Sequence, residues 1–432
     1  MGGCRHAARH VESTAQVATL SGDGADRLMD AKGRFLPYGR QVVEDDDVAA
    51  VAEVLRGDWL TTGPTVESFE RAFSESVEAP FTIACSSGTA ALHIAALAAD
   101  LGPGNRAIVP TVTFLATANA VRYAGAEVVF SDVDPDTGLM RPVDLEEAFA
   151  RAGGSVKAVF PVDLAGQCEN LPVIHEIASR NNALVIEDAC HALGTTYLRN
   201  GLTTKIGACA DAAMSIFSFH AVKTVAMGEG GAVTLRDAKL AARLARLRNH
   251  GMTRDSGDFE RKDLAFDSDG MPNPWYYEMP EVGFNYRASD IHSALGLSQL
   301  KKLDRFVLAR RTLAKNYDEQ LKPFAPLIVP LARTPDCDPA WHLYVALFDF
   351  DALGITRAQL MRALKDNGIG TQVHYMPVSR QPYYRRRYGD ISLPGADRYY
   401  ARCLSLPLHA GMTDADVDRV VAALRDIVGK SK

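Results

Sequence analysis

Between Phe81 and Glu187 the chain alternates short apolar runs with amphipathic stretches, and this pattern limits the fold more than any other feature. Such alternation is typical of a mostly parallel sheet with helices on both faces, an α/β fold. Ligands of these folds bind beyond the carboxyl ends of the strands. The predicted strands are residues 81–85, 107–110, 127–133, 156–162 and 183–187, and the predicted helices are residues 89–99, 114–123, 144–152 and 171–181.

The length of 432 residues exceeds what one typical core contains, so we expect two domains. A large domain is predicted over residues 35–300 and a smaller α/β domain over 301–432. A long helix over 289–321 bridges them, followed by a strand over 341–350, a helix over 356–367, a strand over 370–375 and a helix over 413–428. Residues 1–34 contain no long apolar stretch, which predicts a disordered extension and no secretory signal.

Composition excludes several classes of protein. The apolar fraction of 47% and the charged fraction of 23% are those of a soluble globular protein, and the net charge of -6 does not favour a nucleic-acid partner. No apolar run reaches the length of a membrane span. The seven cysteines are scattered and never spaced as paired metal ligands, so we expect reduced thiols, no metal site and a cytoplasmic location.

One lysine lies in an unusually apolar setting. The sequence predicts a strand over residues 213–219, a glycine turn over 228–231 and a returning strand over 232–235, with Lys223 on the connection. A partly desolvated lysine amine is nucleophilic and forms imines with carbonyl compounds, including pyridoxal phosphate. Most lysines are simply exposed on the surface, so this interpretation depends on partners elsewhere in the chain.

A carboxylate at the end of a buried strand is the first such partner. The run Ala183–Ile186 is wholly apolar and leads into Glu187 and Asp188. An ionised carboxylate beside a pyridine nitrogen keeps that nitrogen protonated, which lets the ring accept electrons from a substrate carbanion. Asp188 is the candidate for this role, and a helix N-cap is the alternative.

The second partner is a candidate phosphate site. The strand over 81–85 runs through Ser86, Ser87, Gly88 and Thr89 into an alanine-rich helix. The free amides and the positive dipole end of such a helix start favour a bound phosphate. A helix cap rich in serine and threonine is also common where no ligand binds.

Together these motifs resemble the DegT/StrS-type sugar aminotransferases that depend on pyridoxal 5′-phosphate. The resemblance rests on Ser218–Lys223 with Gly228–Gly231, on Glu187–His191 and on Gly283–Arg287, and it runs from about Pro37 to the last helix. It implies the fold of fold-type I pyridoxal-phosphate enzymes, a large domain with a mostly parallel sheet and a smaller α/β C-terminal domain. It also implies pyridoxal 5′-phosphate as the cofactor.

Within the family, three features are most similar to the transaminases of the pseudaminic acid pathway. They are Trp59–Pro64, His191 in place of the glutamine of many relatives, and Gln372–Pro377. This resemblance implies amino transfer from an amino acid, L-glutamate, to the 4-keto carbon of a UDP-linked 4-keto-6-deoxy-N-acetylhexosamine. A nucleotide 4-keto-sugar of the perosamine or aminoarabinose type is the alternative substrate.

The resemblance also implies a role for each matching residue. Lys223 holds the cofactor and moves a proton during the reaction, while Asp188 protonates the ring nitrogen. The other implied cofactor contacts are Gly88, Thr89 and Ser218 at the phosphate, Phe114 on the ring face and His191 at the ring hydroxyl. The implied substrate contacts are Thr62, His220, His374 and Tyr375.

The implied assembly is a homodimer with shared active sites. In the family an asparagine of the neighbouring subunit completes the phosphate site, and the matching residue is Asn285. Two rival functions use the same fold. In the deoxysugar dehydratases of the family a histidine replaces the lysine, which Lys223 contradicts, and a cofactor-binding regulator without activity has no need of Lys223, Asp188 and the phosphate site together.

Overall fold

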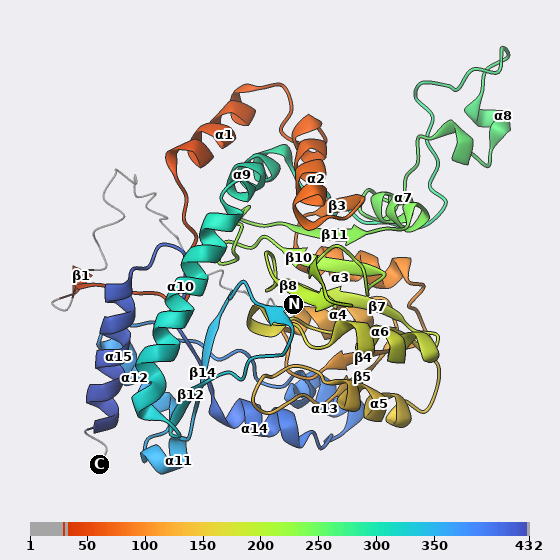
Figure 1. Cartoon of the computed structure of the whole chain (residues 1–432). Helices are drawn as coiled ribbons and strands as arrows, with labels where there is room; N and C mark the ends of the chain where they lie inside the picture. Colours follow the sequence, from red (N-terminus) through yellow and green to blue (C-terminus); the bar gives the residue numbers. More distant parts are fainter. Residues whose placement is uncertain (1–28, 31–32, 430–432) are drawn as a thin grey trace, which may run out of the picture.

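A seven-stranded sheet lies at the centre of the computed structural model, which describes residues 29–30 and 33–429 (Figure 1). The strands lie in the order β3 (Phe81–Cys85), β11 (Gly231–Leu235), β10 (Met214–Ser218), β7 (Leu184–Asp188), β6 (Val156–Val159), β4 (Arg106–Pro110) and β5 (Glu127–Ser131). Only β11 is antiparallel to its neighbours; the other adjacent pairs are parallel. The α/β fold with a mostly parallel sheet is therefore confirmed.

Alternate side chains of the strands point to opposite faces of the sheet, and helices bury both faces. Ile108 of β4 packs in a cluster with residues of α5 and α6, whereas its neighbour Val109 packs in a cluster with residues of α3 and α4. The helices of this part are α2 (Pro64–Val77), α3 (Gly88–Ala98), α4 (Leu115–Tyr123), α5 (Pro142–Arg151), α6 (Leu171–Arg180) and α7 (Ala238–Leu247).

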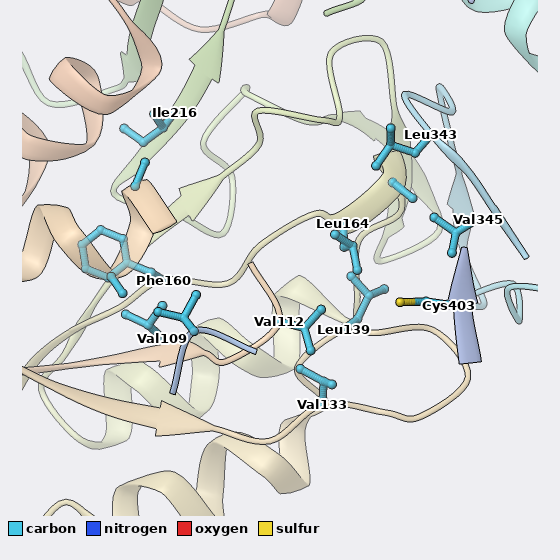
Figure 2. Packing of buried hydrophobic residues seen from close by; sticks show 14 of the residues in the cluster. Val109, Val112, Val133, Leu139, Phe160, Leu164, Ile216, Leu343, Val345 and Cys403 are labelled. Carbon is cyan, nitrogen blue, oxygen red and sulfur yellow. The ribbon is translucent and has the colours of Figure 1, made fainter. Parts of the chain in front are cut away.

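The C-terminal part adds a small antiparallel sheet, β12 (Ile328–Pro330), β14 (Tyr344–Phe348) and β15 (Cys403–Leu406). Its helices are α11 (Phe350–Leu353), α12 (Arg357–Asp366), α13 (Pro382–Tyr388), α14 (Pro394–Arg402) and α15 (Asp414–Gly429). Leu343, Val345 and Cys403 share one hydrophobic cluster with Leu139 and Leu164, so the two parts pack on each other (Figure 2). The domain boundary at residue 300 remains our proposal.

A third sheet joins segments that are distant in the sequence. The hairpin of β8 (Thr196–Arg199) and β9 (Leu202–Lys205) pairs with β13 (Cys337–Asp338), which precedes β14. This hairpin was not among the elements predicted from the sequence. It brings the chain beyond α10 (Leu303–Leu321) back against the region that follows β7.

Two predicted elements differ in the structure. The long helix over 289–321 is divided into α9 (Asp290–Leu300) and α10 (Leu303–Leu321), because Lys302 leaves helical geometry with ψ near 2°. The buried Lys302 amine there forms ion pairs with Asp46 and Asp47 at the start of α1 (Asp45–Arg56). The predicted strand over 370–375 is an irregular loop with one isolated bridge, Gln372 to Ser405.

The predicted extension of residues 1–34 lies outside the described residues, apart from the short pair β1 (Met29–Asp30) and β2 (Gly33–Arg34). The polar segment over 253–280 contains the short helix α8 (Lys262–Ala265) and projects from the body (Figure 1). Among the described helices, none is both long enough and apolar enough to cross a membrane.

Candidate active site

A cavity of about 660 Å³ opens at the carboxyl ends of β3, β4, β7 and β10. Its wall on the side of the large sheet includes Ser87, Gly88, Thr89, Thr113, Phe114, Asp188, His191, Ser218, His220 and Lys223. The C-terminal part contributes His342, Gln372, Val373, His374, Tyr375 and Met376. The cavity is therefore lined by segments that are more than two hundred residues apart in the sequence.

Lys223 lies on a turn that is fixed at its base. The predicted hairpin is confirmed, with β10 and β11 antiparallel and Ser218 opposite Gly231. The Phe219 amide donates to the Gly230 carbonyl at 2.8 Å, and the Lys223 amide donates to the His220 carbonyl at 2.8 Å. Below the turn, the ring of Phe219 packs edge-on against the buried aromatic rings of α2. The lysine backbone is thus held at the cavity wall.

The surroundings of the Lys223 amine favour its neutral form. Burial lowers the pKa of Lys223 below its ordinary value, and the charge of Arg310 acts in the same direction, while Cys190 and Asp188 oppose the shift. A larger fraction of neutral amine at a given pH makes a lysine a better nucleophile toward carbonyl carbon.

Asp188 ends β7 with its carboxylate buried at the cavity wall. Thr117 donates from its hydroxyl to Oδ2 at 2.7 Å, and the Cys190 amide donates to Oδ1 at 3.3 Å. No helix of the described chain starts at Asp188, so the alternative of a helix cap is wrong. Both donors hold the carboxylate in one orientation at the cavity wall.

No ion pair of the described residues includes Asp188, although its carboxylate is buried. Burying an unpaired charge is costly, so such a group favours the arrival of a cation. A protonated pyridine nitrogen has the required charge and a single N–H donor.

The start of α3 lies against the end of β10. Ser87 caps the helix by accepting from the Ala90 amide, which leaves the amides of Gly88 and Thr89 without intrahelical acceptors. A Cβ on Gly88 would stand 2.9 Å from the Ser218 Cβ, so only glycine lets the helix start come this close. Gly88, Thr89 and Ser218 all line the cavity, and their hydrogen-bond donors are suited to an anion.

Phe114 presents an apolar ring to the cavity, with 56% of its surface exposed. An exposed aromatic ring inside a cavity is suited to stack on a planar ligand. The ring lies 6.0 Å from that of Tyr375 on the opposite wall.

The protonation of His191 follows from its hydrogen bonds. Its Nδ1 accepts from the Ala165 amide at 3.3 Å, so the proton lies on Nε2, which is 3.3 Å from the Tyr375 hydroxyl. Burial, and then the charge of Lys223, lowers the pKa of His191 well below its ordinary value. His191 is therefore a neutral donor that faces the cavity.

The irregular loop over 370–377 owes its position to the C-terminal part. Ser405 bonds Nδ1 of His374 at 2.7 Å, and the Tyr399 hydroxyl donates to the His374 carbonyl at 2.8 Å. Burial lowers the pKa of His374 to about 3 and raises that of Tyr375 above its ordinary value. His374 is thus neutral and Tyr375 is a protonated hydroxyl at the cavity wall.

Two predicted site residues do not reach this cavity. Asn285 is exposed and bridges to Asn249, and Thr62 is exposed with φ of 59° before α2. His220 is exposed at the mouth. Asn285 and Thr62 have no contact with the cavity of their own chain.

The structure adds residues that the sequence analysis missed. Thr117 bonds Asp188, and Thr113 bonds Thr117 at 2.8 Å, so two hydroxyls four residues apart on the turn and first helical turn after β4 support the carboxylate. Tyr38, Glu229 and His342 also line the cavity. The four-residue spacing of the two threonines was the one sequence feature that could have indicated their role. No local sequence feature marks Tyr38, Glu229 or His342 as a cavity residue.

The cavity fits pyridoxal 5′-phosphate in each of its parts. The phosphate matches the helix start at Gly88, the ring nitrogen matches the unpaired Asp188, and the ring face matches Phe114. The carbonyl carbon matches the amine of Lys223, which shares the cavity.

Comparisons with known proteins agree with this geometry. The chain is 39% identical over 404 residues to the spore coat polysaccharide biosynthesis protein SpsC of Bacillus subtilis (strain 168), covering 93% of this chain and 99% of that one. Helicobacter pylori PseC, an aminotransferase of pseudaminic acid biosynthesis, superposes with a TM-score of 0.81 at 28% identity, over 92% of this chain and all of that one.

The sugar aminotransferase Spr1654 of Streptococcus pneumoniae superposes with a TM-score of 0.80 at 26% identity, over 92% of this chain and 98% of that one. Its structures include forms with pyridoxal phosphate and with its aminated counterpart. The predicted enzyme class and cofactor are confirmed, since the matched structures are those of aminotransferases and include forms with pyridoxal phosphate. Residues 41–425 match the family's sequence pattern. The chain thus belongs to the DegT/DnrJ/EryC1/StrS aminotransferase family.

Proposed function

We propose that this enzyme transfers an amino group from L-glutamate to the 4-keto carbon of a UDP-linked 4-keto-6-deoxy-N-acetylhexosamine, a reaction of pseudaminic acid biosynthesis. The observation that carries the proposal is the meeting of Lys223 and the unpaired Asp188 in one cavity. When bound there, pyridoxal phosphate supplies an electron-accepting ring and the carbonyl carbon that carries the amino group.

Each residue of the chain then has a task. Lys223 would hold the cofactor through its amine, and its free amine would carry a proton to or from the substrate carbon. Asp188 keeps the ring nitrogen protonated. Phe114 would fix the plane of the ring, and His191 would lie beside the ring hydroxyl. Gly88, Thr89 and Ser218 bind the phosphate.

The sugar faces the C-terminal wall in this proposal. Tyr375 accepts from Nε2 of His191, so its own proton is available to a ligand in the cavity. His374 and His220 line the same cavity as Lys223. A protonated hydroxyl among neutral histidines suits the hydroxyl and keto groups of a sugar, which carry no charge.

We further propose a homodimer in the cytoplasm whose active sites are shared. A dianionic phosphate needs more donors than one helix start supplies. Asn285 is exposed and outside the cavity of its own chain, as expected for a residue that serves a second copy. Thr62 is likewise available to the partner's sugar site.

A second candidate substrate has its own support. The protein SpsC, whose name places it in spore coat polysaccharide biosynthesis, is 39% identical to this chain, whereas PseC is 28% identical. A different nucleotide-linked 4-keto-6-deoxysugar is therefore the alternative. Both substrates require the same amino transfer at a keto carbon.

A substrate panel decides between them. The purified enzyme is offered UDP-linked and dTDP-linked 4-keto-6-deoxysugars, with and without the N-acetyl group, together with glutamate. Mass spectrometry and NMR identify the aminated product. Amination of the UDP-N-acetyl substrate at carbon 4 with the highest kcat/KM supports the proposal. A preference for a sugar without the N-acetyl group would replace it with the alternative.

A further inference from the structure

Two cysteines from distant parts of the chain touch each other outside the cavity. Cys168 follows a short 3-10 helix (Leu164–Gly166), and Cys337 begins β13. Their sulfur atoms lie 3.6 Å apart. Six cysteines lie in the described part of the chain, and within that part only these two have sulfurs in contact.

The contact makes the two thiols chemically different. The Cys168 thiol donates to the Cys337 sulfur, and the Cys168 amide donates to the same sulfur at 3.4 Å. These bonds lower the pKa of Cys337, although burial opposes them. The same thiol bond, together with burial, raises the pKa of Cys168. Cys337 is therefore the nucleophile of the pair, and Cys168 keeps its proton.

Solvent reaches the pair from one side. Cys337 is half-buried between the exposed residues Asp336 and Asp338, while Cys168 is buried below it with 2% of its surface exposed. An external reagent therefore meets Cys337 first. Cys168 is then in contact with the sulfur on which any adduct of Cys337 forms.

We propose that Cys168 and Cys337 form a thiol–disulfide exchange site that accepts small-molecule disulfides such as glutathione disulfide. The Cys337 thiolate attacks one sulfur of the reagent, forms a mixed disulfide and releases the first reagent thiol. Cys168 then loses its proton and attacks the Cys337 sulfur, which releases the second reagent thiol. The two cysteines are oxidised to one disulfide, and the reagent is reduced to two thiols.

The bond closes on segments that also build the cavity wall. The Ala165 amide donates to His191, and the His342 amide donates to the Ala165 carbonyl at 2.9 Å. Bringing the sulfurs from 3.6 Å to bonding distance moves them together by about 1.5 Å. The disulfide thus joins the two segments that support His191 and His342, without touching Lys223.

Peptide mapping of the full-length native protein tests this proposal, which does not depend on the identity of the sugar. The protein is incubated with glutathione disulfide, free thiols are alkylated, and trypsin is added without a reductant. Cleavage after lysine and arginine gives residues 158–180, which contain Cys168 alone, and residues 334–357, which contain Cys337 alone.

We expect a peptide that joins residues 158–180 to residues 334–357 and that disappears with dithiothreitol. Both alkylated single peptides should decrease by about tenfold or more. Cys85 and Cys209 are buried and have no neighbouring cysteine sulfur. They should therefore stay reduced, and the alkylating reagent should reach them only after the protein is unfolded. Alkylation of both Cys168 and Cys337 when the oxidised protein is unfolded in the presence of the alkylating reagent would overturn the proposal, as would a stable glutathione adduct on Cys337 beside free Cys168.

Single variants test the order of attack. Cys168→Ser should retain a glutathione adduct on Cys337, because no second thiol removes it, while Cys337→Ser should leave Cys168 unmodified. Melting temperature reports whether each variant is folded. Equal modification of Cys168 in the Cys337→Ser protein would contradict the assignment of Cys337 as the nucleophile.

Discussion

The Thr117 hydroxyl donates a 2.7 Å hydrogen bond to Oδ2 of Asp188, and both side chains are buried. A carboxylate only accepts hydrogen bonds, so the Thr117 hydroxyl uses its one proton in this bond. The 2.8 Å contact between Thr113 and Thr117 is then donated by Thr113. Two hydroxyls in series thus orient the carboxylate that is to meet the cofactor ring.

Replacing Thr117 with valine keeps the shape of the side chain and removes the donor. A hydrogen bond to a charged group contributes about 1.5–3 kcal/mol, so Thr117→Val should lower kcat by about 10- to 100-fold. Thr117→Ser should restore most of the rate. The matched control is Thr82→Val, a buried threonine on β3 whose hydroxyl bonds Ser74. Equal rate losses in both valine variants would assign Thr117 a structural role only.

Asp188→Asn should reduce turnover by more than about 100-fold, because an amide does not hold the ring proton as a carboxylate does. The asparagine side chain still accepts from Thr117, so we expect the melting temperature to stay close to that of the wild type. Near-normal turnover in Asp188→Asn would exclude the proposed role. The rate and the unfolding transition are measured on the same preparation.

Glu187 makes stability depend on pH. Burial raises its pKa from 4.5 to about 7, and Asp163, also buried, faces it. Between these values Glu187 is protonated in the folded chain and ionised in the unfolded chain, so its contribution to stability is lost as pH rises from 4.5 to 7.

Glu187→Gln does not titrate and keeps an acceptor for the Ser215 hydroxyl. Relative to wild type it should therefore become more stable as pH rises through this window, by at most about 3 kcal/mol. Urea unfolding at pH 4.5, 6 and 7 measures the difference. A pH-independent difference would show that the pKa of Glu187 is the same in the folded and the unfolded chain.

Subunit exchange tests the shared site. Lys223→Ala and Asn285→Ala should each be poorly active alone. In a mixed dimer one site carries both lesions and the other carries neither, so activity should return, up to half that of the wild type per mixed dimer. A mixture of wild type with Lys223→Ala controls for exchange itself. No recovery would contradict both the dimer and the shared site.

Much of the sheet was predictable because its strands are short apolar runs between amphipathic helices. The Lys223 turn was predictable for a similar reason, since glycines mark its return. Position along the sequence also placed Asp188 after a buried strand. These features depend on local pattern, which a single sequence contains.

The rest depends on contacts between distant segments. The break at Lys302 reflects ion pairs with the start of α1. The loop over 370–377 has a single bridge, Gln372 to Ser405, and the side chains of Ser405 and Tyr399 hold His374. No local pattern reports such partners, and the same holds for the contact of Cys168 with Cys337.

Reductive trapping tests the central claim, that Lys223 carries the cofactor, most directly. The protein is loaded with pyridoxal phosphate, reduced with borohydride so that the cofactor stays on the amine, and digested with trypsin. A modified Lys223 resists cleavage, so the account predicts one labelled peptide, residues 206–236, which is absent from Lys223→Ala. Label on another lysine, or equal labelling of the Lys223→Ala protein, would contradict it.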